Sequence, residues 1–379
     1  MIESPGILLT ILSFLLVIGP LIFVHEFGHY AVGRMCGVKA DVFSIGFGRE
    51  IFGWNDKRGT RWKVSWMPLG GYVKFAGDMN PASVPDASWE SLPPAERAQT
   101  FQAKTLWQRF LIVLAGPATN FLFAILVFAF FFAAYGEPRT SPVIVMVEQG
   151  SAADRAGIKA GDRIAAIDGT TIDRFEDIAK IVGIRPEERL AITVEREGRS
   201  FEVAATPRTQ VEHDRFGNVF RRGLLGVAAN QMTVVPLAPG EVIGAAVRHT
   251  NDIVTMMVET LWQVISGRRS VKELGGPLKI AQFSGQQASL GLPALVEFMA
   301  VISINLGFIN LLPIPLLDGG HLFFYLLEGV RRRPLSPVVQ EWAFRSGLAL
   351  LLGAMLFVTL NDIVSFGFLD HLAGLIGRS

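Results

Sequence analysis

The sequence predicts an α-helical integral membrane protein that carries one folded α+β domain outside the membrane. Of its 379 residues, 50% are hydrophobic and 18% are charged, and the mean hydropathy is +0.38, whereas soluble domains have about 25% charged residues. Four long apolar segments occur along the chain, and residues 136–290, between the second and third segments, are enough for a separate domain. The net charge of +1 gives no support to nucleic-acid binding. The single cysteine, Cys36, excludes an internal disulfide and a Cys-rich zinc site.

The first two apolar segments are uninterrupted enough to be read as single helices. Residues 7–24 are 18 uncharged residues, about 27 Å of helix, which is enough to span a bilayer. Residues 110–135 are 26 residues without a charge, interrupted only by Gly116-Pro117, a pair that neighbouring helices can accommodate. We therefore expect two membrane-spanning helices here.

The last two apolar segments are broken. Between Glu297 and Asp318 lie 20 uncharged residues whose second half contains two prolines, which predicts a discontinuous third span. The fourth span covers about residues 347–360, or extends to Leu369, and is the weakest because Asn361-Asp362 interrupts it.

The distribution of basic residues predicts the orientation. Residues 34–109 carry 11 Lys and Arg, and the short connection after the third span holds four arginines. Because loops rich in Lys and Arg face the cytoplasm, both connections are predicted to be cytoplasmic. Both termini and the long insertion then lie on the opposite side.

The residues His25-Glu26-Phe27-Gly28-His29 form an HExxH pattern. On a helix the two histidines lie on one face, about 6 Å apart along the axis, so both can reach one ion while Glu26 holds the metal-bound water. The alternative is two hydrogen-bonded polar residues in a helix. That alternative is weak, because ionisable residues in hydrocarbon are costly and usually functional.

A catalytic zinc ion takes three protein ligands and leaves one position open, so a third ligand is needed. Asp318 follows the broken third span, where an unpaired carboxylate is costly, and Gly319-Gly320 allow other backbone to come close. His321 is the local rival. The other alternative is that Asp318 serves only as the N-cap of a helix over residues 319–328. We favour Asp318 as the third ligand.

Together, several motifs resemble those of the site-2 protease family of intramembrane zinc metalloproteases. They are residues 25–29 in the first span, Leu317-Asp318-Gly319 after the third span, and residues 115–120 (AGPATN) in the second. Residues 46–48 (GFG) and 68–74 (PLGGYVK) resemble the cytoplasmic-side loop of the bacterial RseP-type branch, the regulators of the sigma-E response. The resemblance covers nearly the whole chain.

The resemblance also implies roles for individual residues. It implies one Zn²⁺ per chain, with His25, His29 and Asp318 as ligands and Glu26 as the catalytic carboxylate. Substrate-binding roles are implied for a further set, namely Asn310, Pro313, Pro315, Asn120, Gly70, Gly71 and Tyr72. For Asn120, a hydrogen bond across helices is the alternative. Alternation over residues 61–73 predicts a β-hairpin that dips toward the site, whose edge can pair with an unwound substrate.

The insertion resembles a PDZ domain in the circularly permuted bacterial form. Residues 143–169 run strand, short helix, turn, strand and turn, and residues 175–182 predict a second helix. The proposed carboxylate-binding loop consists of Gly223, Leu224, Leu225, Gly226 and Val227. The alternative is a domain that binds no peptide tail and only excludes bulky substrates. RseP-type proteins carry two such domains, and this insertion has room for one.

The predicted organisation has nine segments. They are residues 1–34, the first span with HExxH; 35–105, a cytoplasmic loop with a membrane-associated β-hairpin; 106–135, the second span; 140–232, the PDZ domain; 233–290, an amphipathic or linker region; 291–328, the discontinuous third span with the Leu-Asp-Gly motif; 329–345, a basic cytoplasmic loop; 346–369, the fourth span; and 370–379, a tail.

The sequence thus predicts a zinc-dependent intramembrane endopeptidase of the bacterial inner membrane, with its active site toward the cytoplasmic half. The resemblance implies single-span membrane proteins as substrates, such as an anti-sigma factor already cut by a site-1 protease, or signal-peptide remnants, in regulated proteolysis during envelope stress. The main alternative is a non-catalytic PDZ receptor or scaffold with a structural metal site, which has no need of Glu26. A transporter is a weaker alternative, because no internal repeat of the broken span is evident.

Overall fold

The computed structural model describes residues 6–78, 91–183, 185–213, 219–230, 232–267 and 276–365. The predicted tail, the far end of the fourth span and part of the cytoplasmic loop lie outside these residues. The chain divides into two compact units. Unit 1 comprises Met1–Phe128, Ala246–Met257 and Val271–Ser379, and unit 2 comprises Ala129–Ala245 and Val258–Ser270.

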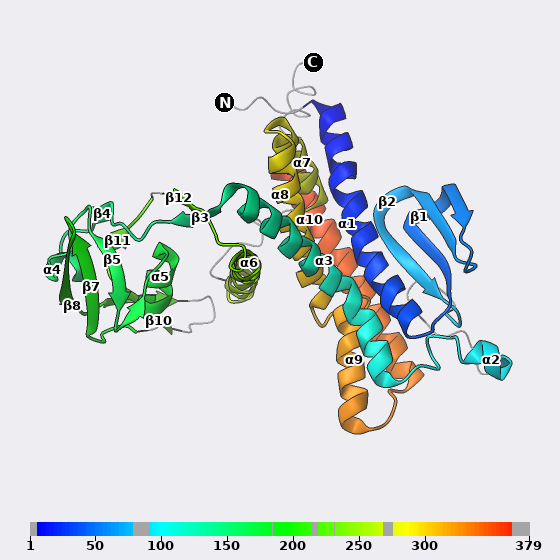
Figure 1. Cartoon of the computed structure of the whole chain (residues 1–379). Helices are drawn as coiled ribbons and strands as arrows, with labels where there is room; N and C mark the ends of the chain where they lie inside the picture. The colour runs from blue at the N-terminus through cyan, green and yellow to red at the C-terminus, as the bar shows by residue number, and fades with distance from the viewer. Residues whose placement is uncertain are drawn as a thin grey trace, which may run out of the picture. The chain divides into compact units, whose positions relative to one another are not determined.

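Unit 1 is built from helices that stand side by side (Figure 1). In chain order the helices that lie wholly or mostly in it are α1 (Ile7–Met35), α2 (Pro94–Arg97), α3 (Leu106–Tyr135), α7 (Pro277–Ser289), α8 (Leu292–Leu311), α9 (Asp318–Arg331) and α10 (Pro337–Ser365). Among the described helices, α1, α3, α8 and α10 are long and apolar enough to cross a membrane. The prediction of four spans is therefore confirmed. Helix α7 packs along α1 and also contacts α8 and α10.

The break in the third span lies at the end of its helix. Helix α8 is continuous over its 20 residues and includes Glu297, which the prediction had placed at the edge of the span. The chain then runs irregularly from Leu312 to Leu317, a stretch with two prolines that cannot donate a helical hydrogen bond, and α9 begins at Asp318.

The fourth span begins earlier than predicted. Helix α10 starts at Pro337 rather than at residue 346, because proline fits the first turn of a helix, where its missing N–H is not needed. The predicted basic loop of residues 329–345 is thereby shortened to the five residues from Arg332 to Ser336.

The predicted hairpin is a small, bent sheet beside α1. It consists of β1 (Ala40–Asn55) and β2 (Arg61–Phe75), and Phe43 pairs with Val73 on one side and with Trp62 on the other. The rings of Phe43 and Trp62 stack with their centroids 4.2 Å apart. Phe43 is buried together with Tyr30 of α1 in one apolar cluster, so the sheet is anchored to the helix that carries HExxH.

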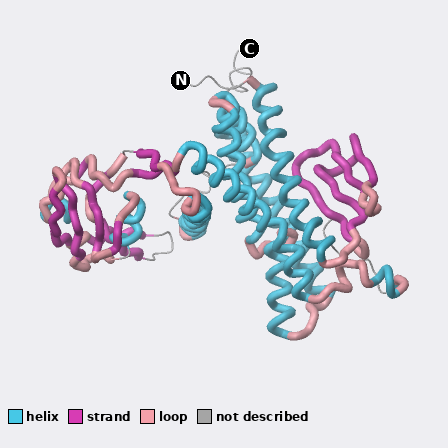
Figure 2. The backbone as a smooth tube through the Cα atoms, viewed as in Figure 1, coloured by secondary structure: helices cyan, strands magenta, loops and turns pink. Residues whose placement is uncertain are grey.

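Unit 2 is an α+β domain of short strands with short helices beside them (Figure 2). Its elements are β3 (Glu137–Thr140), β4 (Met146–Val147), α4 (Ala152–Arg155), β5 (Arg163–Ile167), β6 (Thr170–Thr171), α5 (Phe175–Gly183), β7 (Leu190–Arg196), β8 (Arg199–Ala205), β9 (Arg208–His213), β10 (Val219–Leu224), β11 (Val227–Ala228) and β12 (Met232–Val235). Strands β6, β5, β7 and β8 form one sheet in that order, and β11 pairs with β4. Its core is rich in isoleucine, including Ile144, Ile164 and Ile192.

Helix α6 (Val242–Ile265) has its middle in unit 1 and its ends in unit 2, and it is amphipathic, as predicted for this region. Ala245 and Ala246 are fully buried, whereas Ile243, Val247 and Trp262 are about half exposed. This pattern is typical of a helix that lies along a membrane–water interface.

Candidate metal centre and catalytic site

Helix α1 brings His25 and His29 onto one face, because they are separated by one helical turn. Their Nε2 atoms lie 3.3 Å apart. Asp318, the first residue of α9, places Oδ2 3.2 Å from His25 Nε2 and 3.5 Å from His29 Nε2. Three side chains from two distant parts of the sequence therefore meet at one point.

These three side chains could hold a metal ion. One ligand atom from each lies within 4.8 Å of the other two. Asp318 Oδ2 is buried and has no hydrogen-bond partner among the described residues, which leaves that oxygen for a cation. Two imidazole nitrogens and one carboxylate oxygen match the donor set of catalytic zinc sites, in which a fourth position stays open. The residues present thus fit zinc.

Asp318 is not the N-cap of α9, and His321 does not replace it among the clustered ligand atoms. The N-cap position of α9 is occupied by Leu317, and no side-chain cap hydrogen bond is formed there, so Asp318 does not act as the cap. His321 lines the same pocket but is not part of the cluster of ligand atoms. Its ring packs 5.2 Å from that of Phe344.

Each histidine is held through its other ring nitrogen. His29 Nδ1 donates to the carbonyl oxygen of Ile112 on α3, at 2.9 Å. His25 Nδ1 lies 3.0 Å from the amide nitrogen of Asn120, also on α3. Asn120 is fully buried and is not among the residues that line the pocket, and its amide lies against His25.

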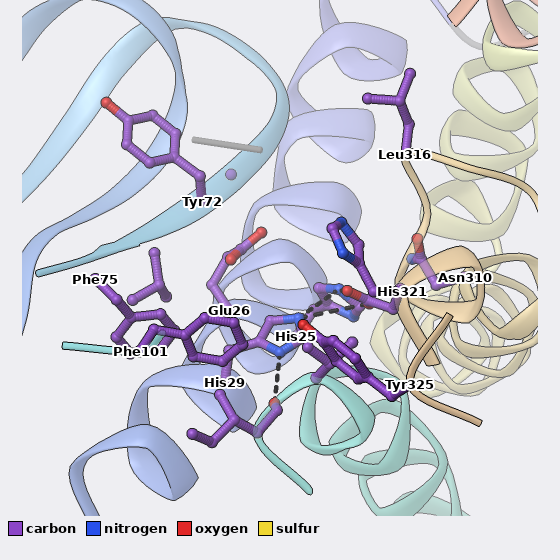
Figure 3. A pocket seen from close by; sticks show the side chains of 15 residues that line it. His25, Glu26, His29, Tyr72, Phe75, Phe101, Asn310, Leu316, His321 and Tyr325 are labelled. Atoms are coloured by element: carbon purple, nitrogen blue, oxygen red, sulfur yellow. Dashed lines mark hydrogen bonds and ion pairs between the residues drawn. The ribbon is translucent and has the colours of Figure 1, made fainter. Parts of the chain in front are cut away.

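Glu26 faces a cavity of about 210 Å³ beside the cluster (Figure 3). The residues that line this cavity are His25, Glu26, His29, Gly71, Tyr72, Val73, Phe75, Phe101, Ile112, Val113, Asn310, Leu316, Asp318, His321 and Tyr325. They come from α1, β2, the loop that precedes α3, α3 itself, the end of α8, the connection between α8 and α9, and α9. The walls combine apolar side chains such as Val73 and Leu316 with polar side chains, among them Asn310, His321 and Tyr325.

Strand β2 crosses directly over Glu26 at Gly71. A Cβ atom at Gly71 would lie 2.8 Å from Glu26 Cγ and 2.7 Å from Ile22 Cγ2, too close for any side chain. The glycine therefore allows the backbone of the hairpin to approach the Glu26 side chain. Of the other predicted hairpin residues, Tyr72 lines the cavity, whereas Gly70 lies against Phe47.

The end of α8 contributes Asn310 to the cavity wall, and the connection between α8 and α9 contributes Leu316. The amide nitrogen of Asn310 donates to the carbonyl oxygen of Leu306, which leaves the amide oxygen for other partners. Leu316 has a positive φ of 83°, an uncommon and strained conformation for a residue with a branched side chain. Pro313 and Pro315 do not line the cavity, and Pro315 packs against Gly347 of α10.

The turn of the hairpin is fixed to α1 through Asp56. Its Oδ2 accepts hydrogen bonds from Trp62 Nε1 at 3.0 Å and from the Tyr30 hydroxyl at 3.3 Å. Tyr30 is the residue that follows His29 on α1. Burial alone would raise the pKa of Asp56, but these bonds and those from the backbone N–H groups of Thr60 and Arg58 hold it below its ordinary value. The ionised carboxylate therefore fixes the sheet beside the site.

The predicted peptide-binding loop lies in unit 2, at a second cavity. This cavity, of about 170 Å³, is lined by Phe175, Ile178, Ala179, Val182, Gln210, Gly223, Leu224, Leu225, Gly226 and Val227. All five residues of the predicted loop are among them. One wall is the apolar face of α5, so the cavity lies between a helix and the loop.

Sequence reasoning missed several lining residues. Tyr325 lies one helical turn beyond His321, a spacing that could have indicated it. Phe75 and Phe101 stack on each other in the cavity wall, with ring centroids 5.7 Å apart. Ile112 acts through its backbone carbonyl, for which no sequence signal exists, because every residue has one.

The comparisons with known proteins agree with this geometry. Residues 13–354 match the model described as Peptidase family M50. A candidate zinc metalloprotease of Agrobacterium fabrum is 46% identical over 360 residues, covering 94% of this chain and 96% of that protein. One of Rhizobium meliloti is 44% identical over 359 residues, covering 93% and 96%. Metalloprotease MmpA of Caulobacter vibrioides is 36% identical over 402 residues, covering 98% and 99%.

The chain therefore belongs to peptidase family M50. With its four apolar helices, it is a multi-pass membrane protein.

Proposed function

We propose that this protein is a zinc-dependent endopeptidase that cleaves peptide bonds within the membrane. The observation that carries the proposal is the convergence of His25, His29 and Asp318 beside Glu26 in one cavity, on helices apolar enough to span a bilayer. The relatives named as zinc metalloproteases support the choice of zinc.

The proposed chemistry assigns one task to each group. His25, His29 and Asp318 would hold the ion, and a zinc ion there would supply Lewis-acid chemistry toward a water molecule and the scissile carbonyl. Glu26 would accept a proton from the attacking water and return it to the leaving amine as the C–N bond breaks. Its exposed fraction of 8% keeps bulk water away from this proton transfer.

The substrate must lose its helical structure before it can be cut, because a helical carbonyl is hydrogen-bonded and covered. We assign the replacement partners to the amide oxygen of Asn310 and to the backbone around Gly71 and Tyr72. Both border the cavity next to Glu26. A substrate paired there as an extended strand would present its carbonyl groups to the site.

The proposed substrates are single-span membrane proteins, including anti-sigma-like proteins after a first cut and signal-peptide remnants. The proposed location is the bacterial inner membrane, with both termini and unit 2 outside and the active site toward the cytoplasmic half. The support for this orientation is the excess of Lys and Arg in residues 34–109 and 331–345.

For unit 2 we propose a PDZ-type domain that binds peptide C-termini. The support is the cavity between α5 and residues 223–227, where a peptide strand could add to the edge of β11. Peptides with free and amidated C-termini separate the alternatives. Preferential binding of the free carboxylate supports recognition, whereas no binding of either peptide favours a domain that only excludes bulky substrates.

The proposed activity is tested by Glu26→Gln in the full chain, purified in detergent with a model transmembrane substrate. We expect cleavage to fall by at least about 100-fold while zinc content stays at one per chain, because glutamine cannot accept the proton. Glu297→Gln is the matched control, since Glu297 is an exposed acid of α8 that does not line the cavity. Cleavage retained by Glu26→Gln would contradict the proposal, and wild-type protein that binds zinc but cuts nothing would favour a receptor or scaffold.

A further inference from the structure

Asn120 lies behind the metal centre, on the side opposite the cavity. It is fully buried on α3, and its side-chain amide nitrogen lies 3.0 Å from His25 Nδ1. We propose that Asn120 is a positioning residue, whose amide holds the imidazole of His25 so that Nε2 points toward His29 and Asp318. This inference rests on the proposed zinc site and extends it to a residue outside the ligand set.

The hydrogen of the neutral His25 ring needs a hydrogen-bond acceptor when the ring binds a metal. His25 Nε2 is the atom that meets the other ligand atoms, so when it binds a metal the hydrogen of the neutral ring must be on Nδ1. His29 already has this arrangement, because its Nδ1 donates to the carbonyl oxygen of Ile112. His25 Nδ1–H needs an acceptor of the same kind, and Asn120 is the side chain placed to supply it.

The Asn120 amide can supply that acceptor if it rotates by about 180° about its last side-chain torsion. Asn120 Oδ1 is buried and has no hydrogen-bond partner among the described residues, while the amide nitrogen faces His25. Exchanging the two ends places Oδ1 against Nδ1–H. An amide can therefore donate to the ring when Nδ1 is bare and accept from it when Nε2 holds a metal. An apolar residue can do neither.

The backbone of Asn120 is fixed from two neighbouring helices. Ser303 Oγ on α8 donates to the carbonyl oxygen of Asn120 at 2.9 Å. On the preceding residue, Thr119 Oγ1 donates to the carbonyl oxygen of Val24 on α1 at 3.0 Å. Gly28 lets α1 lie directly on α3 at Ala115. The amide thus stands on a rigid platform, as a residue that orients a metal ligand requires.

Both imidazoles are therefore held from α3, but by different groups. The support for His29 is a backbone carbonyl, which no substitution removes. The support for His25 is a side chain, so its contribution can be measured. Replacing a group that orients a ligating histidine typically weakens metal affinity by about 10–100-fold.

The test is zinc affinity of the full chain in detergent, measured by competition with a chromophoric chelator. Asn120→Leu removes the acceptor, and we expect about 10–100-fold weaker binding. Asn120→Asp keeps an oxygen that accepts from Nδ1–H beside a dication, and we expect affinity within a few-fold of wild type. With Co²⁺ in place of zinc, Asn120→Asp should retain the visible ligand-field spectrum of wild type, whereas Asn120→Leu should alter it.

Gln108→Leu is the matched control, because it removes a side-chain amide from the same helix, α3, that contacts Thr105 and neither imidazole. We expect wild-type zinc affinity from this variant. Asn120→Ala repeats the test if Asn120→Leu does not fold, as judged by thermal unfolding of the metal-free protein. Wild-type affinity in Asn120→Leu or Asn120→Ala, or an equal loss in Asn120→Asp or Gln108→Leu, overturns the positioning role. If the wild-type chain binds no zinc, the proposed zinc site itself is wrong.

Discussion

At the scale of single residues, the site depends on how closely backbone and side chains approach α1. Glu26 is covered by the strand at Gly71, His25 is backed by Asn120, and His29 is backed by the carbonyl oxygen of Ile112. Each of these contacts joins the HExxH helix to a different part of the chain. A small change in any of them displaces a reacting group without altering the ligand set.

Gly71→Ala tests the closest of these approaches. The added methyl group would lie within 3 Å of Ile22, Glu26 and the carbonyl oxygen of Ser44, so the strand must move away from the carboxylate. Because displacements of about 1 Å cost up to about 100-fold in rate, we expect cleavage to fall by about 10–100-fold at unchanged zinc content. Gly19→Ala adds the same group to α1 where nothing lies within 4 Å, and should cleave like wild type. Equal rates for the two variants would refute the argument.

At the scale of elements, the end of the fourth span holds the start of α7. Asp362 of α10 is fully buried, and its carboxylate accepts hydrogen bonds from the backbone N–H groups of Gly276 at 3.0 Å and Lys279 at 3.2 Å. The Lys279 ammonium lies 3.8 Å away. A carboxylate at a helix N-terminus is favoured by the orphan N–H groups and the helix dipole. Since α7 packs along α1, this contact joins the fourth span to the helix of the metal centre.

Asp362→Asn should destabilise this junction. Asparagine keeps the shape but loses the charge and one acceptor, so we expect a loss of about 1–3 kcal/mol in stability, seen as a lower unfolding temperature in detergent. Glu341→Gln is the comparison, because the pair of Glu341 with Arg345 on the same helix is solvent-exposed and should cost less than about 0.5 kcal/mol. Equal shifts in the two variants would show that burial of Asp362 gives no added stability.

At the scale of the whole molecule, the chain has two units with different kinds of core. Unit 1 depends on apolar helices that also present large hydrophobic side chains such as Leu122 and Leu126 on their outer faces. Unit 2 has an enclosed isoleucine core and an ion pair in which the carboxylate is buried and the guanidinium is partly exposed. In that pair Arg196 donates two hydrogen bonds to Asp162, of 2.6 and 2.7 Å, and Asp162 is 1% exposed. We therefore expect acid to destabilise unit 2 by protonating the Asp162 carboxylate.

The pH dependence of unit 2 follows from this pair. Burial alone would raise the pKa of Asp162, but the hydrogen bonds from Arg196 and from the N–H of Lys159, with the charge of Arg196, hold it below its ordinary value. The stability it contributes is therefore present above the unfolded pKa of about 3.9 and is lost as the pH falls through the lower, folded value. Asp162→Asn should lower the stability of unit 2 at pH 7 by about 1–3 kcal/mol and reduce its further loss on acidification. Calorimetry of the full chain between pH 2 and 7 measures both, and an unchanged acid response would contradict the assignment.

Much of the fold was predictable because its signals are local. Apolar length gave the four spans, and the helical spacing of His25 and His29 placed both on one face of α1. The limits of the elements were less predictable. Helix α8 includes Glu297 and α10 begins at Pro337, because helix ends depend on capping and on what packs against them as well as on hydropathy. The residue pairs behind the histidines had no local signal.

The sequence by itself determined that this is a membrane protein with an HExxH helix and an acidic residue after a broken span, since hydropathy and helical period are properties of neighbouring residues. The tertiary structure decided that Asp318 rather than His321 joins the two histidines, that Asn120 lies behind His25, and that Gly71 lies over Glu26. These contacts link segments far apart in the chain. Their geometry is set by how closely the helices and the sheet pack, which no local pattern encodes.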